Sequence, residues 1–181
     1  LTASKLFQLL VRFFDAIATH NCLDWFSQHF PVVIQFIQQQ LAQVGIKAQV
    51  QALEAGQRVE KVESHQDAAT APVRLYYTGW SSSTGEADWG LRPLFAGDKT
   101  PPSMYNISYY KNPTVDADIM KALGTTDRAE KTKLYTEVQE EIWKDAPWAF
   151  LVTEKLLYAT SKKLTGMYVM PDANYFFEEI D

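Results

Sequence analysis

Apolar residues change their spacing from one segment of this chain to the next. Between Pro31 and Gly45 they recur every three or four positions, at Val33, Ile37, Leu41 and Val44. This spacing predicts a helix that ends at Gly45. Residues 46–52 then alternate between apolar and polar, which is the period of a half-buried strand.

A second helix and a second strand are predicted in the same way. Residues 54–63 fit a helix with Val59 and Val62 on its inner side, and residues 73–78 alternate like a strand. The order helix, strand, helix, strand favours an α/β fold in which helices flank a mixed sheet. Residues 1–30 carry apolar residues at helical spacing and are compatible with an amphipathic helix.

The second half of the chain contains two clear helix patterns. Asn112 before Pro113 marks the start of the first, which is expected to end at Gly124. Its predicted apolar positions are Val115, Ile119 and Leu123. Asp127 and Glu130 match a capping box for the second helix, which should continue to about Trp143. Its predicted apolar positions are Leu134, Val138 and Ile142, and its predicted solvated positions are Lys131, Lys133, Glu137 and Glu140.

Two further segments flank these helices. Residues 93–106 are rich in proline, and we expect a structured surface loop there. Pro147 should end the second helix, after which residues 148–158 contain the apolar run expected of a strand.

The candidate binding site lies where the predicted strand 73–78 stops. Gly79 and Gly85 bracket Trp80 and four consecutive hydroxyl residues, Ser81, Ser82, Ser83 and Thr84. Hydroxyl and amide groups exchange hydrogen bonds in many directions, while an indole ring offers a flat apolar wall. Asp88 follows, placed either to cap a short helix or to meet a cationic ligand group. Such a loop suits a polar small molecule, although the same residues also form ordinary turns.

This loop resembles the signature loop of bacterial extracytoplasmic solute-binding proteins of the peptide-binding family. Within Gly79-Trp80-Ser81-Ser82-Ser83-Thr84-Gly85-Glu86-Ala87-Asp88, the family pattern matches at Gly79, Trp80, Gly85 and Asp88. The resemblance runs from about Val33 to the end of the chain and includes the segment 38–47. It implies part of a two-lobed type II periplasmic-binding-protein fold.

The resemblance also implies a domain organisation. Residues 31–152 would form part of the C-terminal lobe, and residues 153–181 a tail that returns to the first lobe. Residues 1–30 do not resemble the family and are either a divergent helix or the product of a frame shift. Family members are longer than this chain, so the resemblance implies a C-terminal fragment whose export signal would be encoded upstream.

By resemblance, the function is that of the substrate-binding component of an ABC importer in the periplasm. Its implied partners are glutathione or a short peptide and the permease subunits in the inner membrane. Dipeptide-binding members place an Asp in the loop opposite the peptide ammonium, whereas this chain has Ser83. A buried ammonium without a counter-charge is unfavourable, so the departure favours glutathione, whose first residue is γ-linked. Another small ligand, such as a dipeptide, opine or metal chelate, remains an alternative.

Composition removes several other classes of function. The 17 basic and 22 acidic residues give a net charge of −5, which argues against nucleic acid as a partner. Cys22 is the only cysteine, and the three histidines, His20, His29 and His65, lack ligand spacing. We therefore expect no disulfide, no metal and no other cofactor. No apolar stretch is long enough for a membrane span.

Two competing hypotheses come from different classes. Ser81–Ser83 with His65 and Asp88 supply the residue types of a hydrolase, but the loop lacks the second glycine of a nucleophile elbow. We therefore expect that this protein is not an enzyme. The other hypothesis is a truncated chain without a ligand, because a site built from two lobes loses contacts when one lobe is missing.

Overall fold

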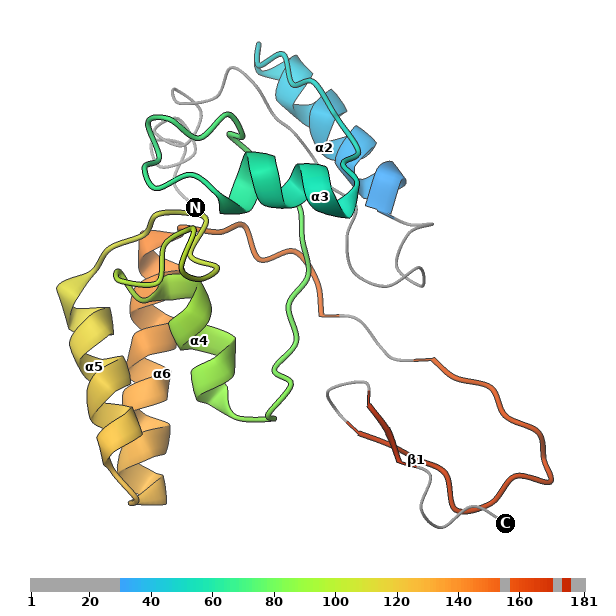
Figure 1. The fold of residues 1–181 in the computed structure, drawn as a ribbon, viewed down its shortest axis with the longest axis vertical. Helices are drawn as coiled ribbons and strands as arrows, with labels where there is room; N and C mark the ends of the chain where they lie inside the picture. The colour runs from blue at the N-terminus through green and yellow to red at the C-terminus, as the bar shows by residue number, and fades with distance from the viewer. Residues whose placement is uncertain (1–29, 154–156, 171–173, 177–181) are drawn as a thin grey trace. The chain divides into compact units, whose positions relative to one another are not determined.

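The computed structural model describes residues 30–153, 157–170 and 174–176. This part of the chain is mostly helical (Figure 1). It divides into two compact units. Unit 1 holds the described residues up to Trp80 together with Gly97–Tyr110, and unit 2 holds Ser81–Ala96 and the described residues from Lys111 onward. The predicted helix within residues 1–30 lies almost entirely outside the described residues.

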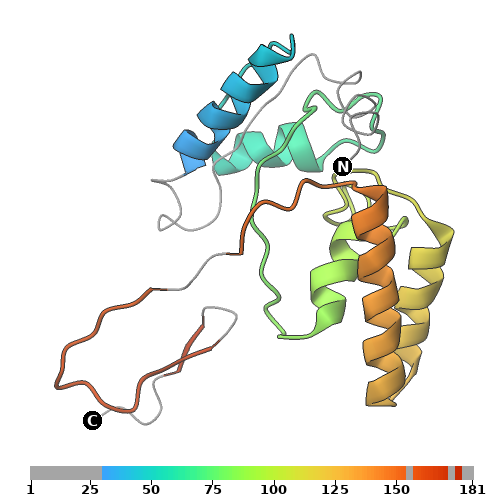
Figure 2. The same cartoon turned by 180° about the vertical axis from the view of Figure 1, so that it is seen from behind.

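Unit 2 is built on three helices, α4 (Ala87–Phe95), α5 (Pro113–Gly124) and α6 (Arg128–Asp145). Helices α5 and α6 lie side by side in both views (Figures 1 and 2). Their facing sides bury Val115, Ile119, Ala122, Leu134, Tyr135, Val138 and Ile142. Leu91 of α4 packs against Ala122, Leu134 and Tyr135. An apolar core between three helices therefore holds this unit together.

Local sequence explains where α5 and α6 begin. The Asn112 side chain accepts hydrogen bonds from the backbone amides of Thr114 and Val115, and Pro113 occupies the first turn. The Asp127 side chain likewise accepts from the amides of Ala129 and Glu130. Each cap satisfies amides that have no partner inside the helix. Both predicted helices are confirmed, with α6 ending two residues later than expected.

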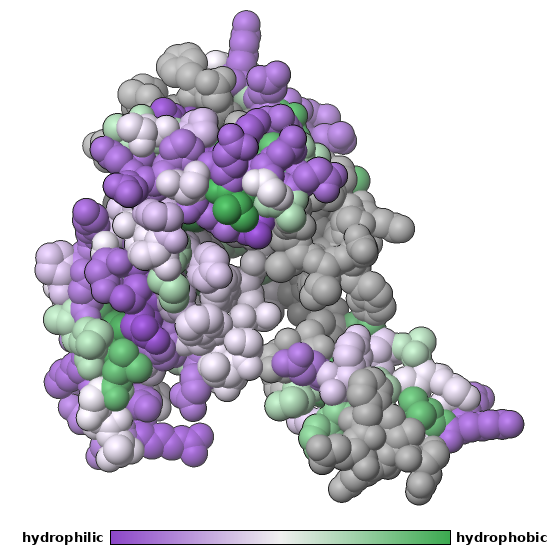
Figure 3. Space-filling model, viewed as in Figure 1, coloured by the Kyte–Doolittle hydropathy of each residue, from purple (hydrophilic) through white to green (hydrophobic). Residues whose placement is uncertain are grey.

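Two details of these helices differ from the prediction. Leu123 is 41 % exposed, and the neighbouring Ala122 is buried in its place. Figure 3 shows hydrophobic positions among hydrophilic ones over α5. The expected capping box is only half formed, because Glu130 accepts from the Thr125 hydroxyl instead of reaching back to the Asp127 amide. That amide donates to the Thr125 hydroxyl.

Unit 1 contains α2 (Phe30–Gln43), α3 (Ala55–Arg58) and η1 (Val59–Glu63), a short π-helical turn. The helix that ends near Gly45 is confirmed, and Gly45 has a φ of +85°, which glycine adopts without strain. Of the predicted apolar positions of this helix, Val33, Ile37 and Leu41 are half-buried and Val44 is 59 % exposed, while Ile34 is the residue that is fully buried. In η1, Val62 is buried as expected, but Val59 is 46 % exposed.

The predicted mixed sheet is wrong for the described residues. Within them the only strands are β1 (Tyr168–Val169) and β2 (Tyr175–Phe176), an antiparallel pair with Tyr168 opposite Phe176. Segments 46–52, 73–78 and the described part of 148–158 have no regular secondary structure. An alternating pattern places side chains on two faces, but a strand also needs a neighbour for its backbone hydrogen bonds. The described residues supply no such neighbour to these three segments.

Two of the loop predictions also need correction. Residues 93–106 are not simply a surface loop, because Pro93, Leu94 and Phe95 are buried in the last turn of α4 and Asn106 is fully buried. After α6, Trp148 and Phe150 pack on Phe95, with ring centroids 4.9 and 6.2 Å away, instead of joining a sheet. In the part of the chain described here, no helix has both the length and the apolar character needed to cross a membrane.

Candidate functional site

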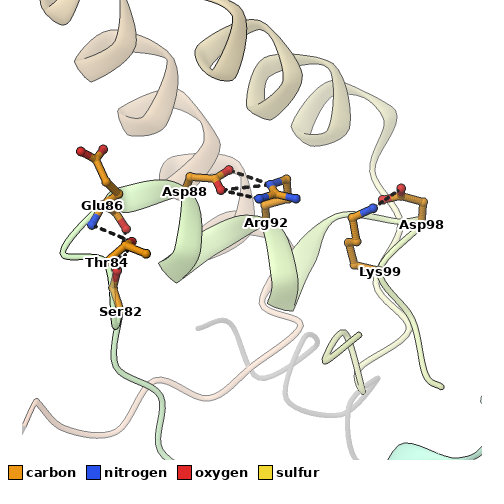
Figure 4. A network of polar contacts seen from close by, with 7 residues as sticks. All are labelled: Ser82, Thr84, Glu86, Asp88, Arg92, Asp98 and Lys99. Carbon is orange, nitrogen blue, oxygen red and sulfur yellow. Dashed lines mark hydrogen bonds and ion pairs between the residues drawn. The ribbon is translucent and has the colours of Figure 1, made fainter. Parts of the chain in front are cut away.

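The hydroxyl loop between Ser81 and Glu86 forms a compact turn in unit 2 (Figure 4). The Gly85 amide donates to the Ser82 carbonyl over 3.2 Å, and the Ser82 hydroxyl donates to the Glu86 carbonyl over 2.8 Å. The Thr84 hydroxyl accepts from the Glu86 amide at 3.2 Å. Gly85 has a φ of +68°, which is strained for any residue with a Cβ. Ser82, Thr84 and Gly85 therefore give the loop its shape.

The other two serines of the loop have a different role in the structure. Ser81 and Ser83 are exposed. Among the described residues, neither hydroxyl makes a hydrogen bond, whereas those of Ser82 and Thr84 are both engaged. The hydroxyl groups of Ser81 and Ser83 can consequently donate hydrogen bonds to, and accept them from, a molecule arriving from solvent.

Asp88 does not cap α4, contrary to one of the two roles expected for it. The residue at the N-cap is Glu86, whose side chain makes no capping hydrogen bond. Asp88 lies in the first turn, and its two carboxylate oxygens receive Arg92 Nε at 2.9 and 3.0 Å and Arg92 Nη2 at 2.7 Å (Figure 4). Paired charges of this geometry are strongly held when partly buried. A ligand ammonium would have to compete with Arg92 for this carboxylate.

Tyr135 of α6 belongs to the core of unit 2 and lies close enough to the turn at Glu86, Asp88 and Arg92 for these charges to act on its hydroxyl. Burial raises the pKa of the Tyr135 phenol, the negative charges of Asp88 and Glu86 raise it further, and Arg92 opposes the rise. Tyr135 thus keeps its proton at pH values well above neutrality. Sequence patterns place Tyr135 in a helix but give no indication of its closeness to this turn.

Trp80 belongs to unit 1, and its environment there includes a residue that sequence reasoning missed. Its ring centroid lies 5.2 Å from that of Tyr105, with the ring planes tilted by 53°. Both side chains remain partly exposed, at 37 and 40 %. Tyr105 lies in the proline-rich segment after α4, where no periodic pattern singles it out.

The residue types of a hydrolase are spread over both units. His65 lies in unit 1, where its carbonyl accepts a hydrogen bond of 2.8 Å from the Tyr109 hydroxyl. Ser81–Ser83 and Asp88 lie in unit 2, and the Asp88 carboxylate is engaged by Arg92. Nowhere in the described ranges do three or more His, Cys, Asp or Glu side chains cluster as a metal site would require.

Solved structures with a similar fold define the class. The chain matches a clavulanic acid biosynthesis oligopeptide-binding protein with a TM-score of 0.74 and 24 % identity, over 90 % of this chain and 29 % of the other. It also matches DppA, a periplasmic binding protein of Helicobacter pylori solved with the peptide STSA, with a TM-score of 0.59 and 26 % identity. That match covers 74 % of this chain and 24 % of the other. The fold is therefore that of part of an oligopeptide-binding protein.

Sequence relatives then narrow the class. The chain is 60 % identical over 149 residues to the glutathione-binding protein GsiB of Pectobacterium atrosepticum and 54 % identical to that of Escherichia coli. Each match covers 82 % of this chain and 29 % of the relative. No protein-family profile matches the chain. The chain is thus a homologue of glutathione-binding protein GsiB and spans under a third of that protein's length.

Proposed function

We propose that this chain contributes to the substrate-binding component of an ABC importer, which captures glutathione or a short peptide in the periplasm and delivers it to the permease. The observation that carries the proposal is the 60 % identity over 149 residues to a protein named for glutathione binding. Identity of this level over such a length reflects shared ancestry and favours a shared ligand. The role is binding, and no bond of the ligand is broken.

The hydroxyl loop supplies the polar contacts in this proposal. Ser81 and Ser83 hold carboxylate or amide groups of the ligand, since both hydroxyls are exposed and uncommitted within the described structure. Ser82, Thr84 and Gly85 keep the loop in the shape that presents them. A loop held in its binding shape loses little conformational entropy when the ligand arrives.

Trp80 and Asp88 complete the proposed set. Trp80 stacks on an apolar part of the ligand, which its partly exposed ring permits. Asp88 acts mainly through Arg92, because the two side chains already neutralise one another. The pair fixes the first turn of α4 directly after the loop, and Asp88 has a minor role in binding a ligand ammonium.

Glutathione is favoured over ordinary dipeptides by the residue at position 83. The resemblance places an Asp of the dipeptide-binding members where this chain has Ser83. A buried ammonium without a counter-charge costs on the order of several kcal/mol. In glutathione the glutamate is linked through its side-chain carboxyl, so its ammonium lies beside a free α-carboxylate and farther from the peptide bond than in a dipeptide. We expect this end of the ligand to sit away from Ser83.

The proposed receptor has two lobes and alternates between an open and a closed arrangement. Residues 31–152 belong to one lobe, and residues 153–181 return to the other. The ligand must bind the closed arrangement more tightly than the open one, because equal affinity shifts no population. Closure removes water from the site and strengthens each hydrogen bond made there.

A calorimetric titration of the 181-residue chain with glutathione and with dialanine tests this proposal. The full-length relative from Pectobacterium atrosepticum serves as a parallel positive control. We expect glutathione to bind and dialanine to bind more weakly. If the relative binds glutathione and the chain does not, the proposal fails for this chain. Binding of dialanine alone would assign it to the general peptide receptors.

A pair of variants tests the role of position 83. Ser83→Asp restores the charge of the dipeptide-binding members, so we expect dialanine affinity to rise and glutathione affinity to fall. Ser161→Asp is the matched control, since Ser161 is an exposed serine of unit 2 whose hydroxyl accepts from the Lys163 amide at 3.3 Å, as a carboxylate also can. Equal effects of the two substitutions on dialanine binding would contradict the assignment of Ser83.

A further inference from the structure

Tyr105 and Trp80 form a half-exposed aromatic pair in unit 1. The two residues are 25 positions apart in the sequence, and their ring centroids lie 5.2 Å apart with the planes tilted by 53°. Tilted rings at this separation attract one another. Trp80 is 37 % exposed and Tyr105 is 40 % exposed, so the contact leaves part of each side chain open to solvent.

The segment that carries Tyr105 is held by the residue that follows it. Asn106 is fully buried, and its Nδ2 donates to the Tyr110 carbonyl over 2.8 Å. Its Oδ1 accepts from the Ser108 hydroxyl at 2.9 Å and from the Tyr110 amide at 3.1 Å. The Asn106 amide donates to the Lys99 carbonyl over 2.8 Å. Asn106 therefore ties both sides of the loop to one point.

The residues before Tyr105 are ordered by a second group of hydrogen bonds. The Thr100 carbonyl accepts from the Ser103 amide at 3.2 Å, from the Ser103 hydroxyl at 2.7 Å and from the Met104 amide at 3.4 Å. The Ile107 amide donates to the Tyr105 carbonyl over 2.8 Å. Backbone on each side of Tyr105 is thus fixed by local bonds. The ring is presented at a defined position although it is not buried.

We propose that Tyr105 is a second ligand-contacting residue, whose ring extends the apolar wall formed by Trp80. This inference rests on the proposed function, because it assigns Tyr105 to the same ligand site as Trp80. A tyrosine on a fixed backbone loses few degrees of freedom when it meets a ligand, so its apolar contact is retained in the binding free energy. The exposed parts of the two rings together offer an apolar surface, which suits the aliphatic or thiol-bearing part of a small peptide.

Titration of Tyr105 variants with glutathione tests this inference. Tyr105→Ala removes the ring, and we expect glutathione to bind about tenfold more weakly. Tyr105→Phe keeps the ring and removes only the hydroxyl, so its affinity should stay within about twofold of the unmodified chain. Tyr158→Ala is the matched control, because Tyr158 is an exposed tyrosine of unit 2.

Folding of each variant is checked by circular dichroism. If Tyr105→Ala does not fold, Tyr105→Leu replaces it, because leucine keeps an apolar side chain but lacks the flat ring. An affinity loss for Tyr105→Ala or Tyr105→Leu, absent from Tyr105→Phe and Tyr158→Ala, supports the inference. Unchanged affinity in Tyr105→Ala or Tyr105→Leu overturns it and leaves the proposed function standing. Failure of the unmodified chain to bind glutathione overturns both.

Discussion

Helices α5 and α6 of unit 2 and the segments 46–52 and 73–78 of unit 1 all carry periodic apolar patterns, yet only the helices have the secondary structure those patterns predict. An α-helix forms its backbone hydrogen bonds within its own segment. A strand forms them with a neighbour. The comparison shows that a periodic apolar pattern can specify a helix from its own segment, whereas it specifies a strand only where a neighbouring strand is present.

The segment 46–52 shows what happens to backbone groups when the ladder is absent. The Ala48 carbonyl accepts a hydrogen bond of 2.7 Å from the Gln38 side chain of α2. The Gln38 side chain thus gives one backbone group a partner that a neighbouring strand would otherwise provide.

The two units also differ in what occupies their best-buried positions. In unit 2 these are apolar side chains of three helices, including Ile119 and Val138 at 1 % exposure each. In unit 1 a fully buried Asn106 organises the segment after α4 through hydrogen bonds to the backbone. One unit is stabilised chiefly by apolar burial, and the order of the 97–110 segment in the other depends on a satisfied polar group.

The largest effect is expected for the apolar core of unit 2. Ile119→Ala should lower the free energy of unfolding by about 2–5 kcal/mol, because it removes buried methyl groups and leaves a cavity. Met120→Ala is the matched control at the next position, where the side chain is 63 % exposed, and it should change stability by less than about 0.5 kcal/mol. Urea unfolding followed by circular dichroism measures both. Similar losses in the two variants would remove the distinction between core and surface on α5.

A smaller effect is expected for the polar centre of unit 1. Asn106→Ala removes the hydrogen bonds that the Asn106 side chain makes with the Tyr110 carbonyl, the Tyr110 amide and the Ser108 hydroxyl, and should reduce stability by about 2–3 kcal/mol. Ser108→Ala removes one of these bonds and should cost about 1 kcal/mol. Hydrogen exchange of the amides in 97–110 measures the local effect. Protection that stays unchanged in Asn106→Ala would show that the segment is held by something else.

The smallest effect is expected for the turn that precedes α4. Gly85→Ala forces a side chain into a φ of +68° and should reduce stability by about 1 kcal/mol. Gly79→Ala is the matched control: a Cβ at either glycine meets open space, but only Gly85 has a positive φ. Thermal unfolding of both variants measures the difference. Equal melting temperatures would mean that the turn relaxes at no cost.

The sequence marks residues 79–88 as a candidate loop, but it does not indicate which of the four hydroxyls stabilise the turn. Four hydroxyls in a row predicted polar contacts without indicating that Ser82 and Thr84 serve the turn while Ser81 and Ser83 do not. The Asp88 carboxylate pairs with Arg92 one helical turn later, a spacing that is readable in the sequence once the helix start is known. Tyr105 had no such signal, since its contact with Trp80 joins two irregular segments.

The sequence by itself determined α2, α5 and α6, with the side-chain caps of α5 and α6 and the glycines at the ends of α2 and α5, because helix formation depends on residues within a few positions of one another. It also determined the positions of the loop glycines and hydroxyls. Only the tertiary structure decided which alternating segments lack strand partners, which polar residue is buried and which aromatic ring meets Trp80. Each of these depends on contacts between segments far apart along the chain, and no local pattern encodes them.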